Sequence, residues 1–270
     1  MAFKRDRFRR LGLSDKPNKQ KVLLALNIIL FIAIFFISFN FLEINFFDFI
    51  TSPIPMISFL FLNFFPPNFN NLPQYLPVVF ESVFFAFAAT YLASFFAFIL
   101  ALFASARLNK NSMLRMFSRG VVAFLRNIPV LIWAWLLIFV FGSGNMVGLM
   151  ALTLSSIGFL ARSYAESFDD ILGDKIEAIE ATGASYSQIL LHGIIPEFIP
   201  SWINWTLYLF ELNIRISAIL GVVGAGGIGT IIQIQLMLRN FQEASTLIIC
   251  LILLVLLTEF AVAKIRNKFM

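Results

Sequence analysis

The sequence has little of what catalytic and metal-binding sites usually need. Its 270 residues include one cysteine, Cys250, and one histidine, His192. A disulfide requires a second cysteine, and zinc sites or Cys/His catalytic pairs require several such residues at characteristic spacings, so all three are poor interpretations. Cys250 is expected to be a small apolar residue inside a helix, and His192 is expected to be a polar residue at a helix end.

Charged residues are also scarce. They make up only 13% of the chain, whereas 60% of residues are hydrophobic and the mean hydropathy is +0.88. An average soluble domain is roughly half apolar and a quarter charged, so this composition predicts a protein that resides in a lipid bilayer. No G-x-x-x-x-G-K-[S/T] sequence occurs. The chain therefore has no evident means of hydrolysing ATP.

Long apolar runs are what the sequence does have. A helix needs about 20 mostly apolar residues to cross a bilayer, and six segments meet this need. A further run, residues 56–65, is too short to span and has prolines on both sides, which predicts an interfacial or re-entrant piece. The prediction is an all-α integral membrane protein with six transmembrane helices. These helices are expected at residues 22–39, 78–106, 120–141, 146–161, 198–222 and 246–263.

The distribution of Lys and Arg predicts how these helices are oriented. Residues 1–21 carry eight cations, residues 43–77 carry none, and cations recur after the second and fourth helices and at the C-terminus. Because cytoplasmic loops are the ones enriched in Lys and Arg, both termini and these two connections are expected in the cytoplasm. The expected parts are a basic cytoplasmic segment at 1–21 that is retained, a first transmembrane helix with an external proline-rich connection at 22–77, and a transmembrane core at 78–268.

A glycine-rich turn joins the fifth and sixth predicted helices. Residues 221–230, GVVGAGGIGT, contain a G-x-G-x-x-G pattern, and Glu243 lies near the place of the ribose-binding acid of a dinucleotide fold. No β-α-β unit surrounds the turn, which is expected on the external side, so nucleotide binding is the poorer interpretation. The better one is that glycines let the backbone turn sharply and let membrane helices approach closely. The glycines of this external loop are Gly224, Gly226, Gly227 and Gly229.

Residues 174–196, DKIEAIEATGASYSQILLHGIIP, form the most informative cytoplasmic segment. Asp174 and Glu177 have the spacing of a capping box, in which two side chains satisfy exposed amides at the start of a helix. Ser185 and Gln188 repeat this spacing. The pattern predicts two short helices beneath the membrane, and an ordinary loop is an equal alternative from these residues alone.

Two residues mark the limits of these short helices. Gly183 lies between them, where a left-handed residue is least costly as glycine. Pro196 can open the fifth membrane helix, because the first turn does not need its missing N–H. The product is predicted to be a compact helix-turn-helix that leads into the fifth helix.

The segment resembles the EAA loop of permease subunits of bacterial ABC importers, whose pattern is E-A-A, three residues, G, nine residues, I, one residue, L-P. The matching positions are Glu177, Ala178, Gly183 and Pro196, and the departures are Ile179, Gly193 and Ile195. Residues 126–142, 157–167 and 211–229 are also similar to the permeases of phosphonate importers. The resemblance covers about residues 75–268.

This resemblance implies a type I, MetI-like permease fold in the bacterial plasma membrane. It implies a pathway for phosphonate or a related small phosphorus-containing anion, with no covalent chemistry and with no cofactor or metal in this chain. The implied partners are a second copy of the chain, a cytoplasmic ATPase dimer that uses ATP and Mg, and an extracytoplasmic solute-binding protein, but no nucleic acid. The residues implied in coupling to the ATPase are Glu177, Ala178, Glu180, Ala181, Gly183, Ala184 and Pro196.

Polar residues inside the predicted spans are candidates for the pathway. Arg126 is expected about 18 Å along the third helix, at a depth where a charge usually faces a cavity or a counterion. Pro129 would open the local hydrogen-bond ladder. Glu211 and Arg215 are spaced i, i+4 and can neutralise one another, and a buried structural salt bridge is the favoured interpretation of this pair. The expected pathway residues are Arg126, Asn127, Pro129, Glu211, Arg215 and Ser217.

Two further segments carry weaker expectations. Arg162, near the inner end of the fourth helix, is expected to extend its charge toward water or to contact the cytoplasmic loop. Residues 228–241 are expected to form an amphipathic external helix, either for contact with a solute-binding partner or for anchoring at the interface.

Other functions stay open at the level of sequence. An importer for another solute, such as an amino acid or a phosphorylated vitamin, is the nearest alternative. An ion-coupled secondary transporter would need coupling groups at the midplane and often has internal repeats, but acidic residues within the spans are scarce beyond Glu81 and Glu211. A membrane enzyme is opposed by the lack of a recognisable nucleophile, base or metal constellation.

Overall fold

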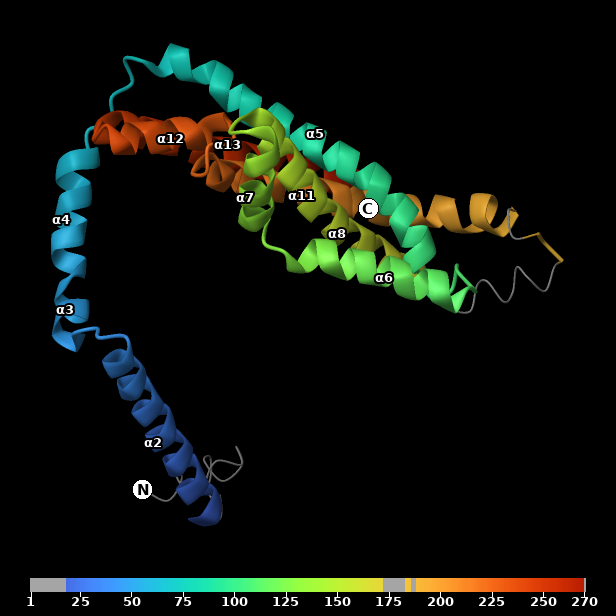
Figure 1. Cartoon of the computed structure of the whole chain (residues 1–270), viewed down its shortest axis with the longest axis horizontal. Helices are drawn as coiled ribbons and strands as arrows, with labels where there is room; N and C mark the ends of the chain where they lie inside the picture. The colour runs from blue at the N-terminus through green and yellow to red at the C-terminus, as the bar shows by residue number, and fades with distance from the viewer. Residues whose placement is uncertain (1–17, 172–182, 186–187, 270) are drawn as a thin grey trace, which may run out of the picture. The chain divides into compact units, whose positions relative to one another are not determined.

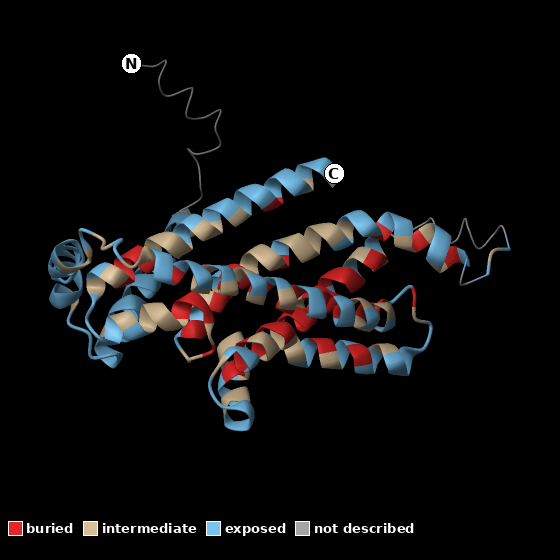
Figure 2. Cartoon of the chain, turned by 90° about the horizontal axis from the view of Figure 1, so that it is seen from above, coloured by how far each residue is buried: buried red, intermediate tan, exposed pale blue. Residues whose placement is uncertain are grey.

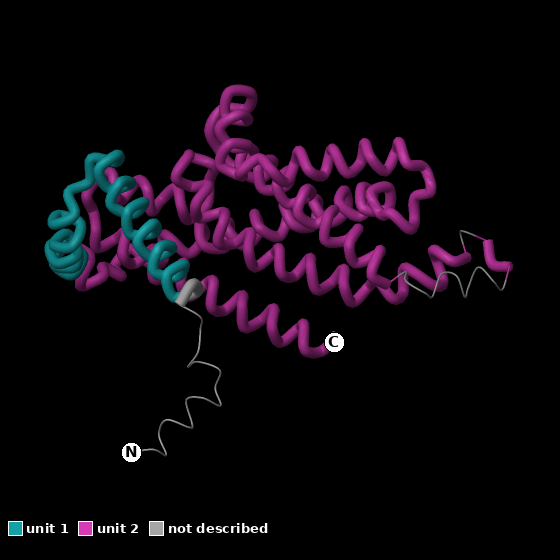
Figure 3. Tube along the Cα trace, turned by 90° about the horizontal axis from the view of Figure 1, so that it is seen from below, with its two compact units in different colours: residues 1–62 teal, residues 63–270 magenta. Residues whose placement is uncertain are grey.

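The computed structural model describes residues 18–171, 183–185 and 188–269 (Figure 1). All regular secondary structure in this part of the chain is helical, which confirms the predicted all-α class. The chain divides into two compact units, residues 1–62 and residues 63–270 (Figure 3).

The first unit consists of helices with almost no buried side chains. α2 (Asn18–Phe41) is apolar along its length, and Lys21–Phe41 is long and apolar enough to cross a bilayer. α3 (Phe46–Thr51) begins after Asn45, whose side chain accepts a hydrogen bond from the Phe47 amide at 3.0 Å. α4 (Pro53–Phe64) follows, and no residue of α3 or α4 is buried. Helices that are apolar on every side require lipid or protein around them.

The structure extends the short apolar run that the sequence placed at residues 56–65. Ser52 joins α3 to α4 in helical conformation, and its amide donates to the Asp48 carbonyl at 2.8 Å. Phe46–Phe64 thereby becomes a stretch of 19 residues that is long and apolar enough to cross a membrane. The expectation of a run too short to span was therefore wrong. Of the flanking prolines, Pro53 and Pro55 lie in the first turn of α4, where a missing N–H is tolerated, whereas Pro66 and Pro67 follow the end of the helix.

The second unit contains the remaining helices, among which α5, α8 and α11 pack against one another. Figure 2 shows that the buried residues concentrate along these helices, whereas the surfaces turned away from them are exposed. The elements are α5 (Leu72–Ala104), α6 (Ser112–Asn127), α7 (Val130–Phe141), α8 (Asn145–Ile171), η1 (Ile189–Ile194), α11 (Ile195–Gly221), α12 (Gly227–Met237) and α13 (Phe241–Phe269).

One face of α5 is made of small residues that recur every three or four positions. Small side chains let two membrane helices approach until their backbones are in van der Waals contact, which replaces the hydrophobic effect as the main attraction inside lipid. α8 packs along this face and buries large side chains such as Leu160 and Tyr164 beside it. The buried small residues of α5 are Ser82, Ala86, Ala89, Thr90, Ala93, Ser94, Ala97, Ala101 and Ala104.

Two buried polar contacts cross the packing of α5, α8 and α11. Asn213 of α11 donates to the Thr90 hydroxyl at 2.9 Å and to the Ser156 hydroxyl at 3.0 Å. The Tyr164 hydroxyl lies 3.1 Å from that of Ser94. Because each of these groups has a partner, the contacts fix the register of the three helices without leaving a buried polar group unsatisfied.

The predicted third span is broken rather than continuous. α6 and α7 meet at an angle of 90°. Ile128 is extended, with φ −86° and ψ 118°, and Pro129 is the N-cap of α7. A proline disfavours helical conformation in the residue before it, so the prediction of one helix over residues 120–141 was wrong. Gly158 of α8 supports the bend, because a Cβ there would lie only 2.6 Å from the Arg126 amide nitrogen.

The other predicted spans correspond to single helices. Among the described residues, the helices long and apolar enough to cross a membrane are α2, the α3–α4 stretch, α5, α8 and α13, and the α6–α7 pair is a sixth candidate. The predicted fifth span corresponds to α11, a helix of 27 residues that includes Glu211 and Arg215. α5 and α13 begin at Leu72 and Phe241, several residues before their predicted starts.

Candidate functional site

The structure describes part of the predicted coupling segment. Gly183 has a φ of +80°, which confirms the left-handed conformation predicted for this residue. The Gln188 side-chain oxygen accepts hydrogen bonds from the Ser185 amide at 2.9 Å and from the Ser185 hydroxyl at 3.0 Å, so Gln188 reaches back as the second capping box predicts. The first box, Asp174 with Glu177, and the predicted coupling residues Glu177, Ala178, Glu180 and Ala181 lie outside the described residues.

The chain passes from this segment into α11 without a break. η1 is a π-helix whose buried Ile189 and Ile194 join the same apolar core as Phe168 of α8. Ala184 packs against this core as well. Pro196 lies in the first turn of α11, as predicted. The sequence analysis placed a separate short helix before Pro196, whereas the π-helix connects directly to α11 and makes the segment mechanically continuous with it.

The bend between α6 and α7 changes the position expected for Arg126. Arg126 lies in the last turn of α6 and is exposed, rather than midway along a continuous span. A cation near the C-terminus of a helix is favoured by the helix dipole, which helps this charge to be tolerated. Asn127 ends α6, and Pro129 stands at the start of α7. The predicted interruption of the hydrogen-bond ladder at Pro129 is therefore confirmed.

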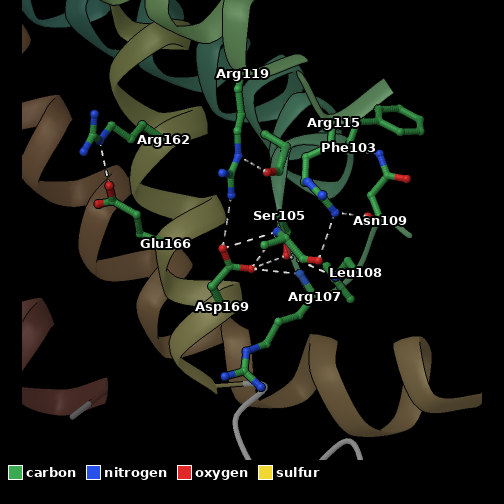
Figure 4. Close-up of polar contacts among 12 residues, drawn as sticks. Phe103, Ser105, Arg107, Leu108, Asn109, Arg115, Arg119, Arg162, Glu166 and Asp169 are labelled. Carbon is green, nitrogen blue, oxygen red and sulfur yellow. Dashed lines mark hydrogen bonds and ion pairs between the residues drawn. The ribbon is translucent and has the colours of Figure 1, made fainter. Parts of the chain in front are cut away.

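A cavity of about 420 Å³, hereafter the arginine cavity, lies between α6 and α8 beside this bend. Its charged lining combines three arginines with two carboxylates. Figure 4 shows Arg162, Glu166 and Asp169 side by side along α8, with Arg119 reaching toward Asp169. The residues around the cavity are Ala104, Arg119, Val122, Ala123, Arg126, Asn127, Arg162, Ala165, Glu166 and Asp169.

Asp169 fastens the end of α5 to α8 (Figure 4). Its carboxylate accepts hydrogen bonds from the Ser105 hydroxyl at 2.5 Å and from the amides of Ala106 and Arg107 at 3.0 and 3.3 Å. Arg119 Nη2 lies 3.6 Å from Asp169 Oδ2. The carboxylate therefore satisfies backbone amides in the turn that follows α5. No pattern in the sequence pointed to Asp169, since its partners just after α5 lie 62 to 64 positions away along the chain.

The predicted pair of Glu211 and Arg215 forms and extends to a third residue. Arg215 Nη2 bonds Glu211 Oε1 and lies 3.7 Å from Glu259 Oε2 on α13. This network joins α11 to α13, and no sequence spacing pointed to Glu259. Arg215 also lines a second, mostly apolar cavity of about 610 Å³ bounded by α11, α12 and α13. The Ser217 side chain is buried, and its hydroxyl donates to the Ile214 carbonyl at 2.8 Å.

The predicted pathway residues therefore do not form one cluster. Arg126 and Asn127 line the arginine cavity, whereas Arg215 lines the apolar one. Arg162, beside Arg126 in the first cavity, pairs with Glu166 through an Nε–Oε1 contact of 2.6 Å.

The glycine-rich turn is a close helix crossing. Gly224, Gly226 and Gly227 have φ values of +74°, +90° and +72°, which side chains rarely adopt. A Cβ on Gly221 would overlap the backbone of Gly229, so α11 and α12 meet backbone to backbone. No β-α-β unit occurs among the described residues. The close-approach interpretation is confirmed, and the helix predicted over residues 228–241 is confirmed in its first part as α12.

Glu243 belongs to a polar clasp next to this crossing. Its carboxylate accepts hydrogen bonds from the Asn71 side chain at 2.7 Å and from the Tyr75 hydroxyl at 2.5 Å. Gln235 of α12 donates to the Tyr75 hydroxyl at 3.3 Å. The clasp joins the starts of α5 and α13, and this structural role replaces the coincidental position of Glu243 in a nucleotide-binding pattern.

The chemically reactive residues have no shared site. Cys250 is half-buried on α13 and packs against the cluster of Tyr75, Ile228 and Leu247, as a small apolar residue would. His192 is exposed in the last turn of η1. Among the residues that the structure describes, no three His, Cys, Asp or Glu side chains are grouped so that they could hold a metal ion.

Comparison with known proteins places these features in one family. The family of binding-protein-dependent transport system inner membrane components matches residues 93–268. The phosphite transport system permease protein PtxC of Stutzerimonas stutzeri is 27% identical over 80% of this chain and 78% of its own length. The putative cryptic phosphonate transport system permease protein PhnE2 of Escherichia coli strain K12 is 33% identical over 45% of this chain and 99% of its own length.

A solved structure agrees with the sequence comparison. The MetNI methionine ABC transporter, crystallised in inward-facing conformations, contains a chain that is 25% identical, with a TM-score of 0.60 over 72% of this chain and 96% of that chain. The match confirms the MetI-like fold predicted from the sequence. With its all-helical second unit and a family match that covers α8, α11 and α13, this chain belongs to the family of binding-protein-dependent transport system inner membrane components, the membrane-embedded transport subunits of ABC importers.

Proposed function

We propose that this chain is the permease subunit that forms the translocation pathway of an ABC importer for phosphonate or a related small phosphorus-containing anion. The proposed solute rests on the match to a phosphite permease over most of both chains, and the match to a phosphonate permease supports it. ATP hydrolysis belongs to a separate ATPase dimer that uses ATP and Mg. An extracytoplasmic solute-binding protein delivers the cargo.

The coupling role is assigned to residues 174–196. In this proposal Glu177, Ala178, Glu180, Ala181, Gly183, Ala184 and Pro196 dock on or support docking of the ATPase. The direct connection of η1 to α11 supports the proposal, because force applied at the segment passes into a transmembrane helix without a flexible joint. The burial of Ile189 and Ile194 against Phe168 gives the same force a second route, into α8.

The orientation of the chain in the membrane is inferred from the positions of Lys and Arg and from the number of crossings between basic segments. Both termini are placed in the cytoplasm, with residues 43–71 outside and residues 105–111 inside. If Phe46–Phe64 crossed the bilayer, the basic N-terminal segment and Arg107 with Lys110 would lie on opposite sides, against the positive-inside rule. The α3–α4 stretch is therefore placed along the outer surface, and α2 is the one crossing of the first unit.

Two copies of the chain complete the pathway. One copy has six crossings, and the exposed apolar side chains on α6 and α7, such as Phe124 and Phe139, supply a surface for a second copy. Arg126, Asn127 and Pro129 are assigned to the pathway at the bend, and Glu211, Arg215 and Ser217 are assigned to it on α11. The glycine loop with Gly224, Gly226, Gly227 and Gly229 is placed on the external side.

An amino acid is the second candidate cargo, because the solved structure that matches the fold is a methionine transporter. Uptake separates the two. Cells or proteoliposomes that contain the chain, its ATPase and its binding protein should take up labelled phosphite or methylphosphonate only while ATP is hydrolysed, and methionine should not compete. Uptake of methionine instead would contradict the proposed solute. Uptake driven by an ion gradient without ATP would contradict the assignment to an ATP-driven importer.

The pathway assignment has its own variant. Arg126→Ala should lower the uptake rate about tenfold while the copurified ATPase stays at the wild-type ratio, since the loss of one charge-assisted contact is worth roughly this factor. Lys264→Ala removes an exposed charge from α13 and serves as the control. Equal uptake by both variants would remove Arg126 from the pathway.

A further inference from the structure

The arginine cavity contains more hydrogen-bond donors than its own acceptors use. Arg119 Nε donates to the Ala104 carbonyl at 2.8 Å, and Arg119 Nη2 pairs with Asp169. Arg162 Nε donates to the Glu166 carboxylate. The side chains of Arg126 and Asn127 make no hydrogen bond or ion pair with any residue that the structure describes. Both Nη groups of Arg162, the whole guanidinium of Arg126 and the Asn127 amide are left over.

One positive charge around the cavity has no carboxylate partner. Asp169 is committed to Ser105, two backbone amides and Arg119, and Glu166 is committed to Arg162. The three arginines and two carboxylates around the cavity therefore sum to one net cation, located on Arg126. An anion that enters meets an uncommitted guanidinium first.

Two rigid supports hold these donors in place. Gly158 seats the end of α6 against α8, since a Cβ there would lie 2.6 Å from the Arg126 amide nitrogen. Arg162 and Glu166 follow Gly158 at intervals of four residues, so they lie on the same face of α8. At the other end of the cavity, Asp169 fixes the turn that follows α5. The helix segments that carry the donors are thus held by these contacts.

We propose that the arginine cavity is a binding site for a small phosphorus oxyanion that still carries one acidic proton, such as hydrogen phosphate or a phosphonate monoanion. Guanidinium groups present planar pairs of donors that match tetrahedral oxyanions. The volume of about 420 Å³ lies within the range of small-ligand pockets. Arg126, Arg162 and Asn127 donate to the oxyanion, and Arg119 contributes its remaining Nη1.

Glu166 gives the site its selectivity. A carboxylate beside an anion is unfavourable unless the anion donates a proton to it. The P–OH of hydrogen phosphate donates to Glu166, whereas sulfate at neutral pH has no proton to donate. The phosphodiester of a lipid headgroup has none either, so the cavity favours a free oxyanion from the aqueous phase over a phospholipid.

The inference rests on the proposed function only for the side of the membrane on which the cavity lies. In the proposed orientation the turn after α5 faces the cell interior, so this cavity lies toward the inner side of the membrane. It is then accessible both to cargo that leaves and to free phosphate in the cytoplasm.

Direct binding to the purified full-length chain tests the site. Isothermal titration in detergent should show that inorganic phosphate binds more tightly than sulfate. Arg126→Gln and Arg162→Gln should each weaken phosphate binding about ten- to hundredfold, the loss expected for a hydrogen bond to a charged group. Arg239→Gln removes the same charge elsewhere and should leave the affinity unchanged. Equal affinity in all four proteins, or sulfate binding as tight as phosphate binding, would overturn the proposal.

Two further experiments test the selectivity of the cavity against sulfate and whether its ligand is a free oxyanion or a lipid headgroup. Glu166→Gln should keep phosphate binding but let sulfate bind to within about twofold, because the amide no longer repels an aprotic anion; sulfate still excluded would contradict the role of Glu166. In nanodiscs, phosphate affinity should be the same in phosphatidylcholine and in phosphatidylglycerol. A loss confined to phosphatidylglycerol would mean that a lipid headgroup occupies the cavity and would overturn the free oxyanion as ligand.

These outcomes are separate from those of the transport assay. ATP-dependent uptake of phosphite without phosphate binding to the purified chain would remove this inference and leave the proposed function. Phosphate binding that depends on Arg126, combined with uptake of methionine alone, would remove the proposed cargo and leave the site.

Discussion

The two ends of α8 are built by opposite means. At its start, Asn145 lies against Gly226, and the nearby crossing of α11 and α12 brings backbones into direct contact through Gly221 and Gly229. At its other end, Asp169 and Arg162 border an open cavity with unused donors. The glycine crossing has no room for change, whereas the arginine cavity has both room and charge. The comparison teaches that rigidity and ligand-binding capacity are separated along one helix.

The largest expected effect is at the glycine crossing. Gly229→Ala should lower the free energy of unfolding by about 3 kcal/mol, because the new Cβ would overlap the Ala218 carbonyl and neither backbone can move away. Thermal unfolding in detergent measures the loss. Gly120→Ala on α6 is the control, since a Cβ there meets nothing within 4 Å and should be neutral or stabilising. Similar stability of the two variants would show that the crossing is not rigid.

Asp169→Ala should have the next largest effect. It removes the acceptor of two backbone amides and a hydroxyl at once, and the expected loss is about 2 kcal/mol of unfolding free energy. Glu166→Ala, three residues earlier on α8, removes an exposed i, i+4 ion pair and should cost less than about 0.5 kcal/mol. If chemical denaturation ranks the two equally, the fastening of α5 to α8 has been assigned to the wrong carboxylate.

Tyr75→Phe should have a smaller effect, in the polar clasp near the glycine crossing. It removes one donor to Glu243 and should cost about 1 kcal/mol. Tyr91→Phe is its control, because Tyr91 lies on the exposed side of α5 and stacks on Phe87 without a hydrogen bond to the described residues. A melting temperature lowered by both changes alike would contradict a specific role for the clasp.

Gly183→Ala should cost no more stability than Tyr75→Phe, and its main effect should be on coupling. Its φ of +80° strains any side chain by about 1 kcal/mol, and Gly142→Ala, at φ +74° and ψ 179°, carries at least as much strain at the end of α7. Uptake per ATP hydrolysed should fall about fivefold in the first variant only. Equal loss in both variants would mean that residues 174–196 are not the coupling segment. Gly183→Pro, which forbids this φ, should abolish docking of the ATPase.

Local features of the fold were predicted well. The capping contact of Gln188 with Ser185 and the left-handed Gly183 depend on residues within a few positions of one another, so sequence spacing was sufficient. The close packing of the glycine turn was predicted from residue type, because glycine alone permits it. The length of Phe46–Phe64 was missed, since prolines were taken as breaks although they start a helix.

The charged site was predicted only in part. Arg126 was selected because a charge in an apolar run is costly, and that reasoning needs no structure. Asn127 was selected with it, but its charged neighbours in the cavity were not found, because Arg119, Arg162 and Asp169 come together only when α6 and α8 pack. Glu259 escaped for the same reason, since it meets Arg215 across two helices that are separated by α12.

By itself, the sequence determined that the chain enters a membrane, where most of its helices run and the capping contact of Gln188 with Ser185. Those properties follow from the transfer of side chains out of water and from backbone geometry over a few residues, both of which are local. The interruption at Pro129 was also local, but only the tertiary structure decided the 90° angle between α6 and α7 and the cavity that gathers three arginines with two carboxylates. The reason is physical: helix crossing angles and close contacts depend on how distant surfaces fit, and charge partners are chosen by that fit.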